Sequence, residues 1–232
     1  MAEAPDTPVG PRLAPSVETV QARLADIWRR IEAAGGSRET VTVVGVTKTF
    51  GVDYVRSAVS AGLIDLGENY AQELVAKDEQ AAAIGVRPRW HFIGGLQRNK
   101  VKLLAGRVSL WQTVDRPVLL DEIAKRSPGS RVLIQVNTTG EEQKSGCHPA
   151  DTSAMVEHGR RIGLDVEGLM TVGPTGGADP RPSFEELRAL GAACGVRELS
   201  MGMSADFALA VEAGATIVRI GSAIFGPREP VR

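Results

Sequence analysis

Apolar residues recur along this chain in two alternating patterns, which are short continuous runs and longer stretches with a helical period. The short runs are bounded by glycine, proline or polar residues, as is typical of strands buried on both faces. We expect strands at Val41–Val46, Leu63–Leu66, Trp90–Ile93, Val108–Trp111, Val132–Val136, Val166–Met170, Glu198–Met201 and Thr216–Ile220. Helices are predicted between them, at 52–61, 69–83, 97–104, 117–126, 150–162, 183–194 and 205–213.

Strict alternation of strands and helices predicts a parallel sheet, because each helix returns the chain to the same end of the sheet. Eight such units are what a TIM barrel requires. We therefore expect the α/β class and a single (β/α)8 TIM barrel with an extra N-terminal helix, which begins after the N-cap candidate Ser16 and ends at Gly35-Gly36. That helix should cap the bottom of the barrel or join its outer ring. A doubly wound open sheet is disfavoured, because no G-x-G-x-x-G follows the first strand.

No break in composition divides the chain, so residues 16–232 are expected to form one barrel domain. Residues 1–15 are rich in proline and lack a basic segment followed by an apolar one. They are predicted to be a disordered lead-in and not a signal peptide. The longest irregular stretch, Gly173–Pro182, follows the sixth strand and is predicted to form a flap at the functional rim.

Composition narrows the classes of partner. Of the 232 residues, 43% are hydrophobic, as is typical of a globular protein. The net charge of -1 gives no reason to expect nucleic acid or an anionic membrane as a partner. No apolar segment reaches the length of a membrane span. Cys147 and Cys194 lack a CxxC spacing, so we expect no disulfide framework and a cytoplasmic location. The three histidines share no metal-ligand spacing, and no metal site is expected.

Candidate chemistry begins at Lys48, directly after the first predicted strand. Side chains alternate along a strand, so Val44, Val46 and Lys48 share one face. This places an amine at the carboxyl end of a barrel strand, where such folds keep their chemistry. An amine removed from water there can condense with a carbonyl group. The alternative is a lysine that simply reaches solvent.

In the last predicted strand, alternation places Ile217 and Arg219 on the inner face. An inward guanidinium requires a partner, because burying it unpaired is costly. Two interpretations stay open at this point. Arg219 forms a salt bridge with an inward carboxylate such as Asp65 or Glu68, or it contacts a bound ligand.

The loops after the last two strands are candidates for anion binding. Gly221-Ser222 opens a short helix at Ala223-Ile224-Phe225, and backbone N–H groups at a helix start can hold an anion. The loop Met201-Gly202-Met203-Ser204 has similar features, with Ser204 a candidate N-cap for the helix at 205–213. In TIM barrels these two loops frequently bind phosphate. Ordinary helix capping is the alternative for each loop.

Three further residues near this rim have two interpretations each. Asn69 is placed to hydrogen-bond a ring hydroxyl or to cap the helix that follows. His91 is a polar contact on the inner face or a histidine of the core. Lys144, in the Lys144-Ser145-Gly146 loop, belongs to a segment that closes over the pocket or is a solvated lysine.

We expect one ligand to contact the lysine after the first strand, the inward arginine and the phosphate cradle. Such a ligand is an aldehyde that carries a phosphate and a polar ring. Pyridoxal 5′-phosphate meets this description. Lys48 would form the Schiff base, Arg219 would face the pyridine nitrogen, and the loops after strands seven and eight would hold the phosphate. The predicted cofactor-binding residues are Lys48, Asn69, Met201, Ser204, Arg219, Gly221 and Ser222.

These residues lie in motifs that resemble the pyridoxal phosphate homeostasis protein family, which shares the N-terminal barrel of alanine racemase. The matching segments are VTK at 46–48, GENYAQE at 67–73, WHFIG and LQRNK within 90–100, QVN at 135–137, KSG at 144–146, GLM at 168–170, LSMGMS at 199–204 and VRIGSAIFG at 218–226. The resemblance implies a protein that keeps cellular pyridoxal phosphate in balance, with pyridoxal phosphate-dependent apo-enzymes as recipients. Phe50-Gly51 and Gly94-Gly95 depart from the family pattern, which often has Lys-Pro and Gly-Pro or Gly-His there; both departures concern the pocket lip.

Two functional classes use this cofactor arrangement, a carrier without turnover and an amino-acid racemase or decarboxylase. A two-base racemase requires a second acid–base group across the ring, which alanine racemase takes from a further, dimer-forming domain. This chain ends with the barrel, and both of its tyrosines, Tyr54 and Tyr70, lie on the barrel itself. An arginine opposite the pyridine nitrogen also weakens the ring as an electron sink. We therefore expect a monomeric carrier. A third interpretation, a Schiff-base aldolase, leaves Arg219 unexplained.

Overall fold

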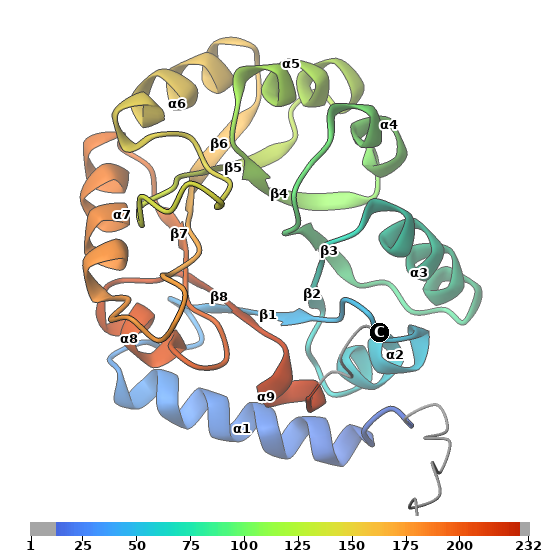
Figure 1. Cartoon of the computed structure of the whole chain (residues 1–232). Coiled ribbons are helices and arrows are strands. Elements are labelled where there is room, and N and C mark those ends of the chain that lie inside the picture. The colour runs from blue at the N-terminus through green and yellow to red at the C-terminus, as the bar shows by residue number, and fades with distance from the viewer. Residues whose placement is uncertain (1–12, 228–232) are drawn as a thin grey trace, which may run out of the picture.

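The structure is a computed structural model that describes residues 13–227. Its parallel strands form a closed barrel in which spatial order follows chain order and β8 pairs with β1. The predicted α/β TIM barrel is therefore confirmed, and Figure 1 shows the ring of strands surrounded by helices. The strands are β1 (Thr42–Val46), β2 (Asp65–Glu68), β3 (Arg89–Phe92), β4 (Val108–Val114), β5 (Arg131–Gln135), β6 (Asp165–Met170), β7 (Glu198–Ser200) and β8 (Ile217–Ile220).

The predicted N-terminal helix joins the outer ring of helices. Ser16 caps it, with its hydroxyl accepting the Thr19 N–H at 3.2 Å. The helix packs against α2, α8 and α9, and Figure 1 shows it beside α9. The helices are α1 (Val17–Ala33), α2 (Val52–Ser60), α3 (Ala71–Ala83), α4 (Val101–Leu104), α5 (Pro117–Arg126), α6 (Thr152–Arg161), α7 (Arg181–Ala193), α8 (Phe207–Glu212) and α9 (Ser222–Phe225), with 3-10 turns η1 (Arg98–Lys100) and η2 (Pro149–Asp151).

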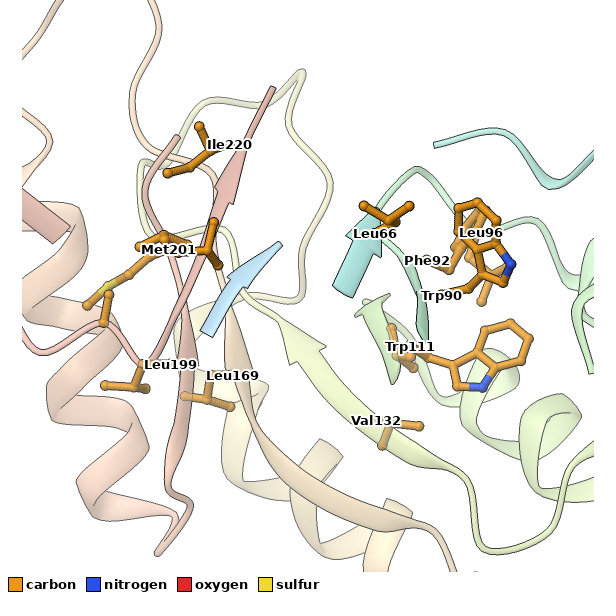
Figure 2. Close-up of a cluster of buried hydrophobic side chains, with 14 of the residues drawn as sticks. Leu66, Trp90, Phe92, Leu96, Trp111, Val132, Leu169, Leu199, Met201 and Ile220 are labelled. Atoms are coloured by element: carbon orange, nitrogen blue, oxygen red, sulfur yellow. The ribbon is translucent and has the colours of Figure 1, made fainter. Parts of the chain in front are cut away.

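Buried apolar residues form two layers, one between strands and helices and one inside the barrel. The outer layer contains large side chains such as Trp90, Phe92 and Trp111, which Figure 2 shows together. Since alternate side chains of each strand enter different layers, the strands are apolar almost throughout. The inner layer consists of Val44, Leu110, Leu133, Met170 and Ile217.

Two strands extend beyond their predicted ends. β2 covers Asp65–Glu68 where the apolar run predicted 63–66, and β4 continues to Val114 where it was expected to end at Trp111. The residues that follow Trp111, Gln112 and Thr113, are polar and resemble a strand end in the sequence. Both are buried in β4 and hydrogen-bonded to neighbouring elements, so their polarity does not stop the strand.

Several helix boundaries also differ from the predicted ones. The stretches at 97–104 and 150–162 each open with a 3-10 turn before α4 and α6 begin. α7 begins at Arg181, so the last two residues of the predicted flap Gly173–Pro182 belong to a helix. A proline is tolerated there because a helix needs no N–H donors in its first turn.

The predicted disordered lead-in, residues 1–15, lies outside the described residues apart from Leu13, Ala14 and Pro15. Within residues 13–227, none of the helices combines the length and the apolar character needed to cross a membrane.

Candidate cofactor site

A cavity of about 390 Å³ lies at the carboxyl ends of the strands. Six of the seven predicted cofactor-binding residues line it, namely Lys48, Asn69, Ser204, Arg219, Gly221 and Ser222. The other lining residues are Val46, Ile93, Met170, Val172, Met203 and Ala205. The sequence placed Val46 on the face of Lys48 and Met203 in a candidate anion loop, but it predicted none of this second group as cofactor-binding. Inward alternation at the ends of β1, β3 and β6 could have found part of it.

Two larger hollows, of about 490 and 530 Å³, lie elsewhere. The first is at the opposite mouth of the barrel, against α1 and the amino ends of β1 to β3. The second is on the outer surface between α4 and α5. Size alone would favour these hollows, but the smaller cavity is the one to which an inward lysine and an inward arginine both contribute.

Lys48 reaches the cavity because of strand alternation. It lines the cavity with Val46, and Val44 lies in the inner apolar layer, so the predicted sharing of one face is confirmed. Thr47, between them, is completely buried on the helix side of β1. Thr49 has a φ of 69°, in the left-handed region that non-glycine residues rarely adopt. The chain therefore turns sharply just after the half-buried lysine.

A cluster of buried charges holds this turn. Lys77 of α3 donates to the Thr47 carbonyl at 2.6 Å. Its ammonium group also pairs with Glu68 at 2.6 Å and Glu73 at 2.7 Å. Glu73 in turn accepts the Thr49 backbone N–H at 2.5 Å. Burial raises the pKa of Glu68 above its ordinary value, although the Lys77 ammonium opposes this. The cluster thus binds the residues on both sides of the lysine.

Arg219 points inward, as alternation predicted, and only 4% of it is exposed. Its guanidinium donates to the Ser200 hydroxyl and to the Thr171 carbonyl, each at 2.7 Å. Burial lowers the pKa of Arg219 to about 10, against the effect of the Asp206 carboxylate. The guanidinium therefore remains charged at neutral pH.

Neither carboxylate considered as a salt-bridge partner of Arg219 contacts it. Glu68 faces the helices, because β2 extends to this residue and alternation turns it outward. Asp65 points inward, but it lies at the start of β2 and pairs with Arg89 at 2.5 Å and with His91 at 3.0 Å. His91 is accordingly a hydrogen-bonded histidine of the core and does not line the cavity.

Ser204 and the start of α9 form a cradle at the cavity. The Ser204 hydroxyl accepts the backbone N–H groups of Gly221 and Ala223, both at 3.3 Å. A phosphate oxygen accepts the same kind of hydrogen bond at a helix start. The prediction that Ser204 caps the helix after β7 is wrong, because α8 begins at Phe207 with Asp206 in the N-cap position, and the Ser204 hydroxyl bonds the start of α9 instead.

Asn69 lines the cavity and does not cap α3, whose N-cap Tyr70 makes no side-chain capping bond. The buried Oδ1 atom of Asn69 has no hydrogen-bond partner among the described residues. A buried polar atom without a partner, next to a cavity, is one that a polar ligand would satisfy. Gly94 allows this arrangement, because a Cβ atom there would lie 2.0 Å from the Asn69 carbonyl oxygen.

Met201 is the predicted cofactor-binding residue that does not line the cavity. Its side chain is completely buried in the outer apolar layer, as Figure 2 shows. Alternation explains the difference, since Ser200 faces the barrel interior and the next residue must face the helices. We therefore correct the prediction for Met201.

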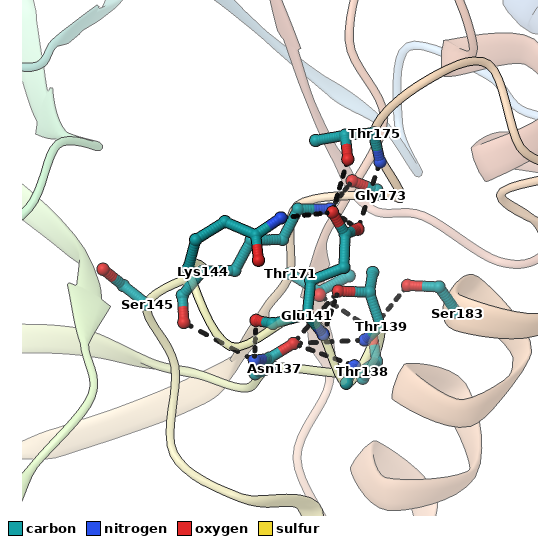
Figure 3. Close-up of polar contacts among 12 residues, drawn as sticks. Asn137, Thr138, Thr139, Glu141, Lys144, Ser145, Thr171, Gly173, Thr175 and Ser183 are labelled. Atoms are coloured by element: carbon teal, nitrogen blue, oxygen red, sulfur yellow. Dashed lines mark hydrogen bonds and ion pairs between the residues drawn. The ribbon is translucent and has the colours of Figure 1, made fainter.

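The loops after β5 and β6 are tied together by a set of contacts that we call the latch, made of Glu141, Lys144, Gly173 and Thr175 (Figure 3). Lys144 donates to Glu141 and to the Gly173 carbonyl, both at 2.5 Å. Glu141 also accepts from the Thr175 N–H and hydroxyl. The hydrogen bond from Lys144 is the largest cause, and that from Thr175 the second, of a lowering of the Glu141 pKa to about 2. Lys144 is therefore not a solvated lysine, and its loop joins the predicted flap.

Comparison with known proteins places the chain in a family. The sequence matches the family model described as alanine racemase, N-terminal domain, over residues 21–229. The pyridoxal phosphate homeostasis protein of Aquifex aeolicus is 40% identical over 224 residues, which cover 89% of this chain and 97% of that protein. The chain belongs to the pyridoxal phosphate homeostasis protein family. The human member of this family is 42% identical over 210 residues, covering 81% of this chain and 76% of that protein.

Solved structures agree with this family assignment. PipY of Synechococcus elongatus, solved with PLP bound, gives a TM-score of 0.77 at 27% identity and covers 89% of this chain and 100% of that chain. Alanine racemase from Corynebacterium glutamicum gives a TM-score of 0.64 at 14% identity, covering 90% of this chain and 60% of that chain. The second likeness concerns the fold alone. Membership of the pyridoxal phosphate homeostasis protein family confirms the resemblance that the sequence motifs indicated.

Proposed function

We propose that this protein binds pyridoxal 5′-phosphate as a Schiff base on Lys48 and serves the homeostasis of this cofactor. The observation that carries the proposal is that an amine, a buried guanidinium and a helix-start cradle all line one cavity. The names of its relatives and the PLP-bound PipY structure support the same ligand.

Each polar part of the cofactor has a candidate partner in the cavity. Lys48 Nζ would attack the aldehyde carbon, and loss of one water would leave a C=N bond. The Asn69 amide would bond the ring hydroxyl, and Arg219 would donate to the pyridine nitrogen. The cradle would take the phosphate. The proposed cofactor-binding residues are thus Lys48, Asn69, Ser204, Arg219, Gly221 and Ser222.

A carrier without turnover is favoured over a racemase or decarboxylase. In the described part of the chain, Lys48 and Arg219 are the only titratable side chains that line the cavity, so a second acid–base group is lacking. Tyr54 stacks on Phe50, with ring centroids 4.3 Å apart, and Tyr70 is 58% exposed; neither lines the cavity. A guanidinium at the pyridine nitrogen keeps it unprotonated and weakens the ring as an electron sink.

The proposal includes a monomer in the cytoplasm that supplies the cofactor to pyridoxal phosphate-dependent apo-enzymes. The net charge of -1 supports partners other than nucleic acid or anionic membranes. Burial raises the pKa of the Cys147 thiol to about 11, which disfavours the thiolate that disulfide formation requires. Light scattering on the purified protein measures its mass, and mixing the loaded protein with an apo-transaminase measures transfer.

Replacing Lys48 tests the covalent attachment. We expect the reconstituted protein to be yellow and Lys48→Ala to lose the colour, because no other amine lines the cavity in the described chain. Borohydride reduction followed by peptide mapping should place the adduct on Lys48. Lys102→Ala, which removes an exposed lysine of α4, is the matched control and should stay yellow. An adduct on another residue would contradict the proposal.

A turnover assay separates the carrier from the enzyme. The loaded protein is incubated with each L-amino acid, and D-isomer and released carbon dioxide are measured. We expect no sustained turnover, since the cavity lacks a second acid–base group. Many turnovers per protein molecule would favour the racemase or decarboxylase instead.

A further inference from the structure

A row of buried polar side chains crosses the interior of the barrel from β8 to β2. Arg219 donates to the Ser200 hydroxyl at 2.7 Å, and Ser200 donates to Gln112 Oε1 at 2.6 Å. Gln112 Nε2 lies 2.8 Å from His91 Nδ1, and His91 Nε2 lies 3.0 Å from Asp65 Oδ1. The row, which we call the inner chain, thus links the cofactor cavity to the opposite end of the barrel.

The two ends of the inner chain determine its direction. A guanidinium can only donate hydrogen bonds, and a carboxylate can only accept them. Ser200, Gln112 and His91 must therefore each accept from one neighbour and donate to the next. Reversing the Gln112 amide would leave the Ser200 hydroxyl without an acceptor in the chain. The arrangement thus requires a neutral His91 with its proton on Nε2.

The burial of the inner chain makes the direction of its hydrogen bonds costly to reverse. Ser200 and Gln112 are completely buried, and the inner apolar layer lies beside them. A polar group left unpaired in such an environment loses its hydration without compensation. At the far end, Arg89 donates to both oxygens of Asp65, at 2.8 and 2.5 Å. Burial acts to raise the pKa of Asp65, but hydrogen bonds from His91 and Arg89 outweigh it and keep the pKa low.

We propose that Ser200, Gln112 and His91 are positioning residues, which orient the Arg219 guanidinium toward the cofactor through a one-way chain of hydrogen bonds anchored on Asp65. A second bond, from Arg219 to the Thr171 carbonyl at 2.7 Å, completes the orientation. The proposal rests on the function proposed above, because it assigns Arg219 to the pyridine nitrogen. It adds three residues that do not line the cavity.

The protonation of His91 tests the chain without any cofactor. The cofactor-free protein is labelled with ¹⁵N-histidine, and the imidazole nitrogen shifts are measured at neutral pH. We expect His91 to be neutral with its proton on Nε2. His148→Asn and His158→Asn identify the signals of the other two histidines. A proton on Nδ1, or on both nitrogens, would overturn the inner chain.

The substitution Gln112→Glu should change the protonation of His91 from neutral to doubly protonated. In Gln112→Glu the side chain can only accept, so it should bind both the Ser200 hydroxyl and a proton on His91 Nδ1. His91 Nε2 still donates to Asp65. The imidazole of the cofactor-free variant should therefore carry protons on both nitrogens. A neutral His91 in this variant would contradict the proposed direction.

Breaking the chain tests the positioning of Arg219. We expect Gln112→Met to release pyridoxal phosphate up to about tenfold faster and to shift the absorption maximum of the bound cofactor, because the buried Ser200 hydroxyl loses its acceptor and one such hydrogen bond is worth about that factor at most. Ser200→Ala, a smaller change that keeps the variant folded if Gln112→Met fails, should act in the same direction.

Gln135→Met is the matched control. Gln135 is also a buried amide of the barrel, on β5, but it donates to the Ser145 carbonyl at 3.0 Å and is no part of the chain. This variant should keep the release rate, the absorption maximum and the His91 signals of the wild type. Unchanged values in both Gln112→Met and Ser200→Ala would overturn the positioning role. If the wild type binds no pyridoxal phosphate, the proposed function fails, while the His91 measurement still decides the inner chain.

Discussion

Lys48 and Arg219 line one cavity from neighbouring strands, but the protein holds the two cations by different means. The residues on both sides of Lys48 are bound from outside the barrel by the ion pairs of Lys77. Arg219 is bound from inside the barrel by neutral groups, the Ser200 hydroxyl and the Thr171 carbonyl.

The difference reflects how far water reaches each group. Outside the strands, the Glu73 side chain of the ion-pair cluster is 23% exposed, so water reaches part of its charge. Beside the buried Arg219 a second charge would lose its hydration, and that loss can exceed the gain from pairing. Neutral acceptors therefore suit Arg219 better than a carboxylate. Because the two supports share no residue, the amine and the guanidinium can be altered separately.

Breaking the charged support should have the largest effect. Lys77→Met leaves two carboxylates without their cation, and removing one partner of a buried ion pair typically costs about 3–5 kcal/mol. The loss should become smaller as the pH falls, because the raised pKa of Glu68 lets its carboxyl bind a proton sooner than an ordinary glutamate would, and a neutral carboxyl needs no cation. Urea unfolding at each pH measures the loss.

Lys125→Met, at an exposed position of α5, is the matched control and should change stability by less than about 0.5 kcal/mol. If Lys77→Met were no more destabilising than this control, the ion-pair cluster would not support the turn that carries Lys48.

Breaking the neutral support should cost less. Arg219→Met leaves the Ser200 hydroxyl and the Thr171 carbonyl without a donor, but no unpaired charge remains. We expect a loss of about 1–3 kcal/mol in the cofactor-free protein, measured by urea unfolding. A loss larger than that of Lys77→Met would reverse the comparison, since the neutral support would then be the stronger one.

The latch should give the smallest change of the three. Since the pKa of Glu141 is lowered to about 2 from 4.5, its contribution to stability is complete above pH 4.5 and is lost as the pH falls toward 2. Glu141→Gln should therefore differ from the wild type near neutral pH and approach it in acid, as measured by unfolding at each pH. Exchange of the Thr175 amide hydrogen, which Glu141 accepts at 3.1 Å, should also be faster in the variant. A difference that grows in acid would contradict this assignment.

Local sequence patterns predicted the fold and the placement of most candidate residues. The β-branched run before Lys48 indicates a buried strand, and alternation then turns the lysine inward, a rule that needs no knowledge of other strands. The same rule applied to β7 turns Ser200 inward and Met201 toward the helices, which excludes Met201 from the cavity. The predicted Ser204 cap was wrong because α8 begins two residues later than expected, with Asp206 in the N-cap position.

The partners of the charged groups could not be predicted in this way. Arg219 meets Ser200 and Thr171, and Glu141 meets Thr175, across 19, 48 and 34 residues of sequence. Such pairs depend on the order of strands around the barrel and on small shifts of register. Alternation places Glu68 on the helix side of β2, but only the packing of α3 against that side brings Lys77 within 2.6 Å of it.

The sequence by itself determined a barrel of alternating strands and helices, with an amine and a guanidinium on its inner face. Periodicity carries this information, because the burial of each side chain follows from its neighbours one or two positions away. Only the tertiary structure decided which groups satisfy those charges: ion pairs outside the barrel for the turn after β1, and a one-way hydrogen-bond chain inside it for Arg219. Hydrogen bonds require contact within about 3 Å, and contacts at that distance between distant segments exist only once the barrel has closed.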